Sequence, residues 1–291
     1  DWSESRGLGD VYKRQKLRDR TRIHKTLKSG EINILVGTHA ILEDIVKFNN
    51  LGLSVIDEQH RFGVAQRAKL WKKNNPSPHI LVMTATPIPR TLAMSIYGDL
   101  DVSTIKELPP GRIETKTVHK YDKNRLSVFS FLKKEIKKGR QVYLVYPLIN
   151  ESEKLDYKDL MDGYNSIVRE FPRPNYQVSI VHGKMNAKDK EYEMNRFIKK
   201  ETQILVSTTV IEVGVNVPNA SVMVIESAER FGLSQLHQLR GRVGRGNDES
   251  YCILMTKDKV SEDSKIRIDT MVKVNDGFKL AEVDLKLRGP G

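Results

Sequence analysis

Apolar and polar positions along this chain form two kinds of pattern, helical spacing and short apolar runs. From Lys16, the spacing of Leu17, Ile23 and Leu27 predicts an amphipathic helix that ends at Ser29-Gly30. Short apolar runs that are rich in β-branched residues and bounded by turn residues follow, and each predicts a strand. These runs are Ile32–Val36, Leu53–Ile56, Ile80–Met83, Lys116–Val118, Val142–Tyr146, Val178–Val181, Ile204–Val206, Val222–Ile225 and Tyr251–Met255. Helical spacing returns between them, so the pattern predicts an α/β fold of parallel sheets flanked by helices.

The clearest linker signal is Leu108-Pro109-Pro110-Gly111, because Pro-Pro-Gly cannot continue a helix. It separates two series of alternating strands and helices. The first fifteen residues show neither helical nor strand periodicity. We therefore expect a foreign or disordered segment, the end of a truncated α/β domain, a linker, a second α/β domain and a helical extension, at residues 1–15, 16–107, 108–115, 116–260 and 261–291.

Composition narrows the class of protein. Among 291 residues, 38% are hydrophobic and 30% charged, which is polar for a globular protein but too apolar for a disordered one. The single cysteine, Cys252, excludes an internal disulfide and any metal site built on a cysteine cluster. No apolar run reaches a membrane span and no secretion signal is evident, so a cytoplasmic protein is expected. The net charge of +12 indicates either a nucleic-acid partner or a solvated lysine-rich surface.

Two consecutive carboxylates, Asp57 and Glu58, follow the predicted strand Leu53–Ile56. Ligands of open α/β sheets bind just beyond the carboxyl ends of strands. There, Asp57 could hold Mg²⁺ directly or through water, and Glu58 could deprotonate a water that attacks a γ-phosphate. The alternative is that the pair is a solvated strand end.

A turn that contains Thr84, Thr86 and two prolines follows the predicted strand Ile80–Met83. The two hydroxyl groups could bond to the acidic pair and report its nucleotide state to a nearby groove. The alternative is an ordinary proline-rich turn between a strand and a helix.

Arg242 and Arg245 lie three residues apart after an apolar helical stripe, so we expect them on one helical face. Two guanidinium groups there could grip the β- and γ-phosphates and stabilise charge in the transition state. The alternative is a generic basic helix. Gly241 and Gly244 argue against it, because glycine is a poor helix residue and permits close approach to a ligand or another backbone.

Small polar residues end two further predicted strands. Ser207, Thr208 and Thr209 follow one, and Thr38 and His39 follow the other. Their side chains could donate hydrogen bonds to the phosphates of a DNA or RNA backbone. Each group alone could equally be a turn.

These elements, in this order, resemble superfamily 2 helicases, and the resemblance covers nearly the whole chain from Lys16. The sequences of segments 57–64, 84–91 and 231–245 are similar to those of the RecG family of bacterial ATP-dependent DNA helicases. The tail 276–291 is similar to the segment before the translocation hairpin of that family. The resemblance implies two RecA-like domains, the first truncated, with nucleotide in the cleft between them.

The resemblance also implies a function. It indicates a monomeric ATP- and Mg²⁺-dependent motor that reverses stalled replication forks and branch-migrates Holliday junctions with 3′→5′ polarity, in recombination and repair. Membrane association is not expected. Residues that match the family's nucleotide-binding or coupling motifs are Gln59, His60, Thr84, Thr86, Gly214, Asn216 and Gln238. Asn216 replaces the aspartate of many relatives, and Arg90 joins the strand-end residues as a candidate DNA contact.

The phosphate loop Gly-x-x-x-x-Gly-Lys-Ser/Thr occurs nowhere in this sequence. We expect it upstream in a longer protein, and we expect the chain alone to be inactive. Two other functions stay open. One is a translocase like the transcription-repair coupling factor, which acts on double-stranded DNA; the other is a non-catalytic DNA-binding module.

Overall fold

The computed structural model describes residues 10–11, 17–58, 73–84, 101–105, 107, 112–147, 153–208, 217–246 and 248–288. Contacts divide the chain into unit 1, Asp1–Thr86, and unit 2, Pro87–Gly291. The linker expected at 108–115 begins later than this division. Residues 85–100 and 108–111 lie outside the described part of the chain, so the linker stays a prediction.

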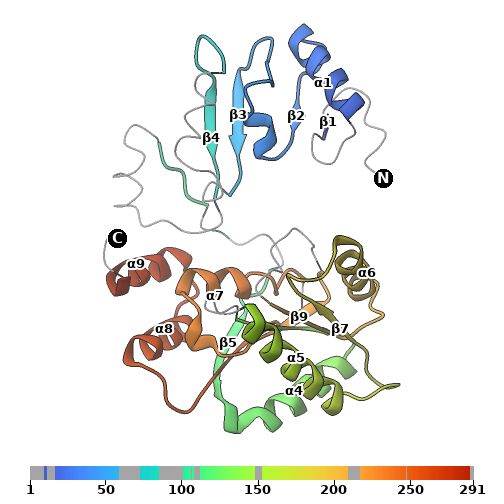
Figure 1. Cartoon of the computed structure of the whole chain (residues 1–291). Helices are drawn as coiled ribbons and strands as arrows, with labels where there is room; N and C mark the ends of the chain where they lie inside the picture. The colour runs from blue at the N-terminus through green and yellow to red at the C-terminus, as the bar shows by residue number, and fades with distance from the viewer. Residues whose placement is uncertain are drawn as a thin grey trace. The chain divides into compact units, whose positions relative to one another are not determined.

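Unit 1 contains helix α1 (Leu17–Ser29), the 3₁₀ turn η1 (His39–Leu42) and two small parallel sheets (Figure 1). One sheet pairs β1 (Asp10–Val11) with β2 (Leu35–Val36). The other pairs β3 (Leu53–Ile56) with β4 (His79–Val82). The helix predicted from Lys16 to Ser29 and the strand predicted at 53–56 are therefore confirmed.

Two expectations for unit 1 are wrong. Asp10–Val11 pair as a strand, although the first fifteen residues show no strand pattern, because two residues are too few to reveal a period. The strand predicted from Ile32 begins only at Leu35. The preceding residues are tied to the helix end, since the amides of Glu31 and Ile32 both donate to the carbonyl of Thr26.

Unit 2 is built on one six-stranded parallel sheet with the order β5-β10-β9-β6-β8-β7. Each strand lies within two residues of a predicted one except for β5, which runs further. The strands are β5 (Lys116–Tyr121), β6 (Gln141–Tyr146), β7 (Val178–Val181), β8 (Ile204–Thr208), β9 (Ala220–Ile225) and β10 (Tyr251–Thr256). Strands β6, β8 and β9 are buried along nearly their whole length, which is typical of a parallel sheet covered on both faces.

Helices cover both faces of this sheet (Figure 1). One face packs against α4 and α5, and the other against α6, α7, α8 and α9. Their bounds are α4 (Arg125–Lys137), α5 (Glu153–Glu170), α6 (Ala187–Ile198), α7 (Leu233–Arg240), α8 (Glu262–Lys273) and α9 (Gly277–Arg288). Two 3₁₀ turns, η3 (Asp122–Asn124) and η4 (Ala228–Arg230), connect strands to helices. The helix predicted at 155–171 is α5.

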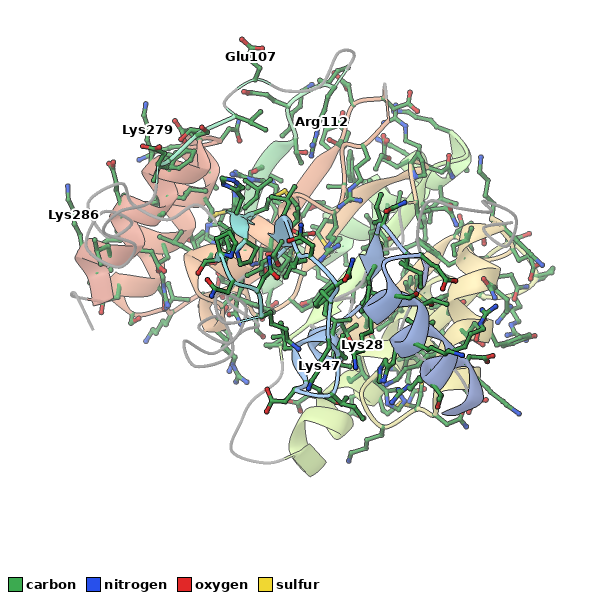
Figure 2. All side chains as sticks on the ribbon, turned by 90° about the horizontal axis from the view of Figure 1, so that it is seen from above. Lys28, Lys47, Glu107, Arg112, Lys279 and Lys286 are labelled. Carbon is green, nitrogen blue, oxygen red and sulfur yellow. The ribbon has the colours of Figure 1, made fainter. Side chains whose placement is uncertain are left out.

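Alternate residues along strands β6, β8, β9 and β10 enter different apolar clusters. On β6, Tyr143 and Val145 face the α6–α9 layer, whereas Val142 and Leu144 face the α4–α5 layer. Local caps fix where the covering helices begin: the side chain of Asn186 accepts from the amide of Asp189 at the start of α6. Most charged residues of unit 2 stay outside, although Glu135, Glu226 and Arg240 are buried. Lys279 and Lys286 of α9 extend into solvent (Figure 2).

Candidate nucleotide site and nucleic-acid interface

The acidic pair of unit 1 lies where the sequence predicts it, directly after β3. Asp57 is exposed, and its Oδ1 accepts a hydrogen bond from the amide of Glu58 at 2.9 Å. Glu58 has φ +52°, a left-handed conformation that costs a residue with a side chain about 1–3 kcal/mol. Such strain is concentrated at functional sites, so this turn is the best candidate for chemistry in unit 1.

The same edge of the β3–β4 sheet carries Thr84. The register pairs Ile56 with Val82, and the amide of Met83 donates to the carbonyl of Ile56 at 2.7 Å. Thr84 therefore follows β4 at the edge where Asp57 and Glu58 follow β3. The structure brings three predicted residues to one sheet edge.

The polar residues after β2 form the start of a 3₁₀ turn. Thr38 precedes η1, and its carbonyl accepts from the amide of Ile41 at 3.0 Å. Its side chain is half-buried and makes no capping bond. His39 is the first residue of η1. In the described part of unit 1 no ladder joins the β1–β2 and β3–β4 sheets, but Leu42 of η1 packs against Ile56, the residue directly before the acidic pair.

The expectation that Arg242 and Arg245 share a helical face is wrong. Helix α7 ends at Arg240, and Gly241–Gly246 form a connection that we call the arginine loop. The loop leaves the helical path because Gly244 adopts φ +75°, which a right-handed helix cannot contain. The Nε of Arg245 donates to the carbonyl of Gly241 at 3.4 Å.

The positive charges of the two loop arginines nevertheless affect the same side chain of unit 2, Tyr143. Burial raises the pKa of Tyr143 to about 12, while Arg245 and Arg242 oppose this shift with their positive charge. The two guanidinium groups therefore lie close enough to the Tyr143 hydroxyl of β6 to be felt there. Tyr143 itself is 2% exposed, whereas Arg242 is half-buried and Arg245 exposed, so the loop carries positive charge from the edge of the core out to solvent.

Arg240, the arginine just before the loop, has a different role. It is buried, and its Nη1 donates to the carbonyls of Met271 and Val274 at 3.0 Å each. Its Nη2 donates to Nδ1 of His237 at 3.2 Å. Burial lowers the pKa of His237 to about 4, and the charge of Arg240 adds to the shift. His237 is therefore a neutral residue bonded to Arg240, and we assign it a structural role in unit 2.

The hydroxyl residues at the end of β8 are interior positions. Ser207 and Thr208 are 0% and 3% exposed, and their hydroxyl oxygens have no hydrogen-bond partner among the described residues. A contact from either one to DNA stays a prediction. Gln238 is exposed on α7, and its coupling role stays a prediction.

Sequence reasoning missed a basic group after β7. Lys184, Lys188 and Lys190 follow this strand in the connection to α6 and in its first turn. Lys190 donates to the carbonyl of Gly183 at 3.1 Å, and the charges of Lys190 and Lys184 add to the effect of burial in lowering the pKa of His182. The signal was in the sequence, since hydrogen-bond donors after a predicted strand are the pattern used for Thr38 and Ser207, and lysines are donors too.

Several predicted site residues lie outside the described residues, and their roles stay predictions. They are Gln59, His60, Thr86, Arg90, Thr209, Gly214 and Asn216. Among the residues that are described, no three His, Cys, Asp or Glu side chains converge on a metal position. A Mg²⁺ ion that shares its coordination with nucleotide phosphates and waters needs fewer. Asp57 fits that role, because it is exposed and uses only Oδ1 in its turn. None of the described helices has the length and apolar content to cross a membrane.

Comparison with known proteins places this geometry in a family context. Residues 6–95 match the DEAD/DEAH box helicase model, and residues 127–247 match the helicase conserved C-terminal domain. The chain thus carries two RecA-like helicase domains of the α/β class, the first one short. The first match begins at residue 6, so it includes part of the segment 1–15 that the sequence analysis set apart.

Individual relatives are more specific. The chain is 54% identical over 272 residues to the ATP-dependent DNA helicase RecG of Synechocystis sp., covering 94% of this chain and 32% of the relative. It is 54% identical over 274 residues to RecG of Bacillus subtilis, covering 94% and 39%. A solved structure of RecG bound to a three-way DNA junction matches with a TM-score of 0.75 and 42% identity, covering 98% of this chain and 36% of that chain. The chain therefore spans about a third of the length of these relatives.

Proposed function

Since this chain is a homologue of the DNA helicase RecG along nearly its whole length, we propose that it is the catalytic part of an ATP-dependent motor that acts on branched DNA. The proposed work is reversal of stalled replication forks and branch migration of Holliday junctions, with 3′→5′ polarity. Two observations, one in each unit, support the proposal: the acidic turn Asp57-Glu58 of unit 1 is strained, and the arginine loop of unit 2 carries Arg242 and Arg245.

Each pair has a distinct part in hydrolysis. Asp57 is the residue that would hold Mg²⁺, which would supply positive charge against the negative charge of the nucleotide phosphates. Glu58 orients the attacking water and accepts its proton. Arg242 and Arg245 donate to phosphate oxygens, where a planar guanidinium fork can make two parallel hydrogen bonds.

The DNA contacts that we propose are made to the backbone. Thr38, His39, Arg90 and Ser207–Thr209 supply polar donors at strand ends, and the lysines after β7 supply charge. Such contacts position a protein without reading sequence, which suits a translocase. They also predict affinity that is independent of sequence and that falls steeply as salt rises, in keeping with the net charge of +12.

A chimera tests the proposal. The matched part of Bacillus subtilis RecG is replaced by this chain, and ATP hydrolysis is measured with and without fork DNA. The chimera should hydrolyse ATP when DNA is added. Arg245→Lys keeps the positive charge but loses the planar guanidinium group. It should lower ATP turnover about 100-fold while the binding of fork DNA is kept. The chain alone should not hydrolyse ATP, because it has no phosphate-loop sequence.

The outcomes separate the alternatives. Loss of fork affinity with intact hydrolysis in Arg245→Lys would place Arg245 on the nucleic acid. A chimera that binds forks but never hydrolyses ATP would favour a non-catalytic DNA-binding module.

A further inference from the structure

We propose that the side-chain hydroxyls of Thr115 and Ser250 form a seat that positions the arginine loop. The two residues touch neither nucleotide nor DNA in this proposal. They act through the backbone of Gly244, which lies between Arg242 and Arg245. The proposal rests on the role given above to these two arginines, and it adds residues that no motif in the sequence indicates.

The seat is a bonded pair of hydroxyls. Thr115 Oγ1 and Ser250 Oγ lie 3.0 Å apart, and Ser250 is 0% exposed. Thr115 comes directly before β5 and Ser250 directly before β10, two strands that pair in the sheet. The amide of Lys116 donates to the carbonyl of Ser250 at 2.9 Å. The pair is therefore held by the first rung of a sheet ladder, which makes it a fixed surface.

Gly244 rests directly on this surface. A Cβ atom at Gly244 would lie 2.7 Å from Ser250 Oγ and 2.8 Å from Thr115 Oγ1, which is closer than real Cβ contacts. Its φ of +75° is also unfavourable for a residue with a side chain. Both facts require glycine, and both show that the loop backbone is pressed against the two hydroxyls.

Other contacts hold the rest of the loop. The side chain of Val243 is 0% exposed in the core between the sheet and the α6–α9 layer. At Gly246, a Cβ would lie 3.1 Å from the carbonyl oxygen of Pro218, so the backbone is close there too. With one residue buried and two glycines pressed against neighbours, the remaining side chains, Arg242 and Arg245, are directed by a fixed backbone.

This rigidity matters because the arginines work by position. A guanidinium that must meet phosphate oxygens as charge develops loses effect steeply with displacement, and a shift of about 1 Å can cost about 100-fold in rate. Removing the Thr115 hydroxyl leaves Ser250 Oγ buried without its partner and loosens the surface under Gly244. We expect the arginine loop to become mobile while the sheet stays intact.

The matched control is a second buried hydroxyl pair in unit 2. Ser179 Oγ donates to Thr202 Oγ1 at 3.0 Å, and both residues are 0% exposed. Thr202→Val removes the same group from a pair of the same length. Neither residue contacts the arginine loop in the hydrogen bonds of the described chain. Thr202 is more buried than Thr115, and Ser179 Oγ also donates to the carbonyl of Glu193 at 3.4 Å. Thr202→Val therefore reports what the loss of a buried hydroxyl away from the loop does to unit 2.

The first measurement is amide hydrogen exchange on this chain. Thr115→Val should raise exchange of the peptide that covers 241–246 about tenfold and leave β6 and β8 unchanged. Thr115→Ser keeps the hydroxyl and should match the parent. Thr202→Val should leave the loop protected. Equal loop exchange in Thr115→Val and the parent would overturn the seat.

The second measurement is ATP hydrolysis by the chimera with Bacillus subtilis RecG. Thr115→Val should lower kcat about tenfold with little change in KM for ATP, as expected when an interaction made in the transition state is weakened. Thr115→Ser and Thr202→Val should stay within about twofold of the parent. A fall in kcat that is the same in Thr202→Val would show a purely structural role and sink the proposal. Wild-type turnover by Arg245→Lys would instead refute the role of the arginines, and hydrogen exchange would still decide whether the seat exists.

Discussion

Unit 2 covers both faces of one six-stranded sheet, whereas the described part of unit 1 contains two separate two-stranded sheets. Parallel strands are stable only when helices or other elements bury both of their faces. In unit 2 two apolar clusters, one on each face, meet this requirement. In unit 1 the described clusters are small: Ile23, Leu27 and Val46 form one, and Leu42 with Ile56 forms the other.

The exposed apolar residues of the described chain make the same distinction. One face of the β3–β4 sheet leaves large side chains 41–58% exposed; these are Leu53, Val55, Leu81 and Met83. In unit 2 every residue of β9 is buried. The comparison teaches that similar strand patterns in sequence do not guarantee similar packing, because a strand needs covering elements as well as a partner.

The two units also differ in how they hold charged groups for chemistry. Unit 1 places its carboxylates in a strained turn directly after a strand. Unit 2 places its arginines on a loop that glycines press against the surrounding structure. A base must move a proton, whereas an arginine only has to be present as charge develops, so different losses are expected from the two.

The largest expected effect tests the chemistry of unit 1. Glu58→Gln in the chimera keeps the shape of the side chain but removes the base, so ATP turnover should fall about 1000-fold. ATP and fork DNA should still bind, because the change leaves Asp57 and the strand-end donors in place. Steady-state hydrolysis and fork binding by fluorescence anisotropy measure the two properties.

A carboxylate elsewhere in unit 1 provides the control. Glu31 is exposed, and its side chain accepts from the nearby Ser29 hydroxyl at 2.7 Å, so Glu31→Gln should leave turnover unchanged. Near-parental hydrolysis by Glu58→Gln would remove Glu58 from the mechanism and leave the strained turn without a catalytic explanation.

The next effect tests the difference in packing. Limited proteolysis of this chain should cut within 16–107 about 100-fold faster than within 116–260, because cleavage needs local opening and opening is easier where few apolar contacts must break. Time courses followed by mass spectrometry would identify the sites. Adding ATP and Mg²⁺ should give little protection to the chain alone. Equal cutting rates in the two regions would mean that unit 1 packs as well as unit 2.

Most of the strands, and the position of the acidic pair, could be predicted from the sequence. The strands at 53–56 and 178–181 and the acidic pair after the first of them are visible in local pattern, because each strand is a short apolar run bounded by turn residues, whatever its burial in the fold. The path of the arginine loop was not predictable. Gly244 is held by Thr115, a residue far away in sequence, and no local spacing reports such a tertiary contact.

A smaller effect tests what ties the C-terminal helices to unit 2. Arg240→Ala leaves the carbonyls of Met271 and Val274 buried without their donor, so unit 2 should lose about 3 kcal/mol of unfolding free energy. Chemical denaturation followed by far-ultraviolet circular dichroism measures this free energy. Arg230→Ala, at an exposed arginine of η4, should cost less than about 0.5 kcal/mol. A similar loss in both variants would mean that the Arg240 bonds do not stabilise the fold.

The smallest effect is a pH dependence that belongs to unit 2. The pKa of His237 falls from 6.5 to about 4 on folding, mainly through burial and further through Arg240, with Asp276 acting in the opposite direction. At pH 7 the imidazole is neutral in both states and contributes nothing. Between pH 6.5 and 4 the unfolded chain takes up a proton that the folded chain refuses, so stability declines as pH falls through this window. Because His237 is only partly buried, we expect the unfolding free energy to fall by about 1.5 kcal/mol, less than the full pKa shift would give.

His237→Gln keeps an acceptor for Arg240 but cannot titrate. Its unfolding free energy, measured by urea denaturation at several pH values, should decline less than the parent's over this window, and the two curves should run parallel above pH 7. Parallel curves at all pH values would show that His237 is protonated as readily in the folded chain as in the unfolded one, and the neutral, bonded histidine assigned to α7 would then be wrong.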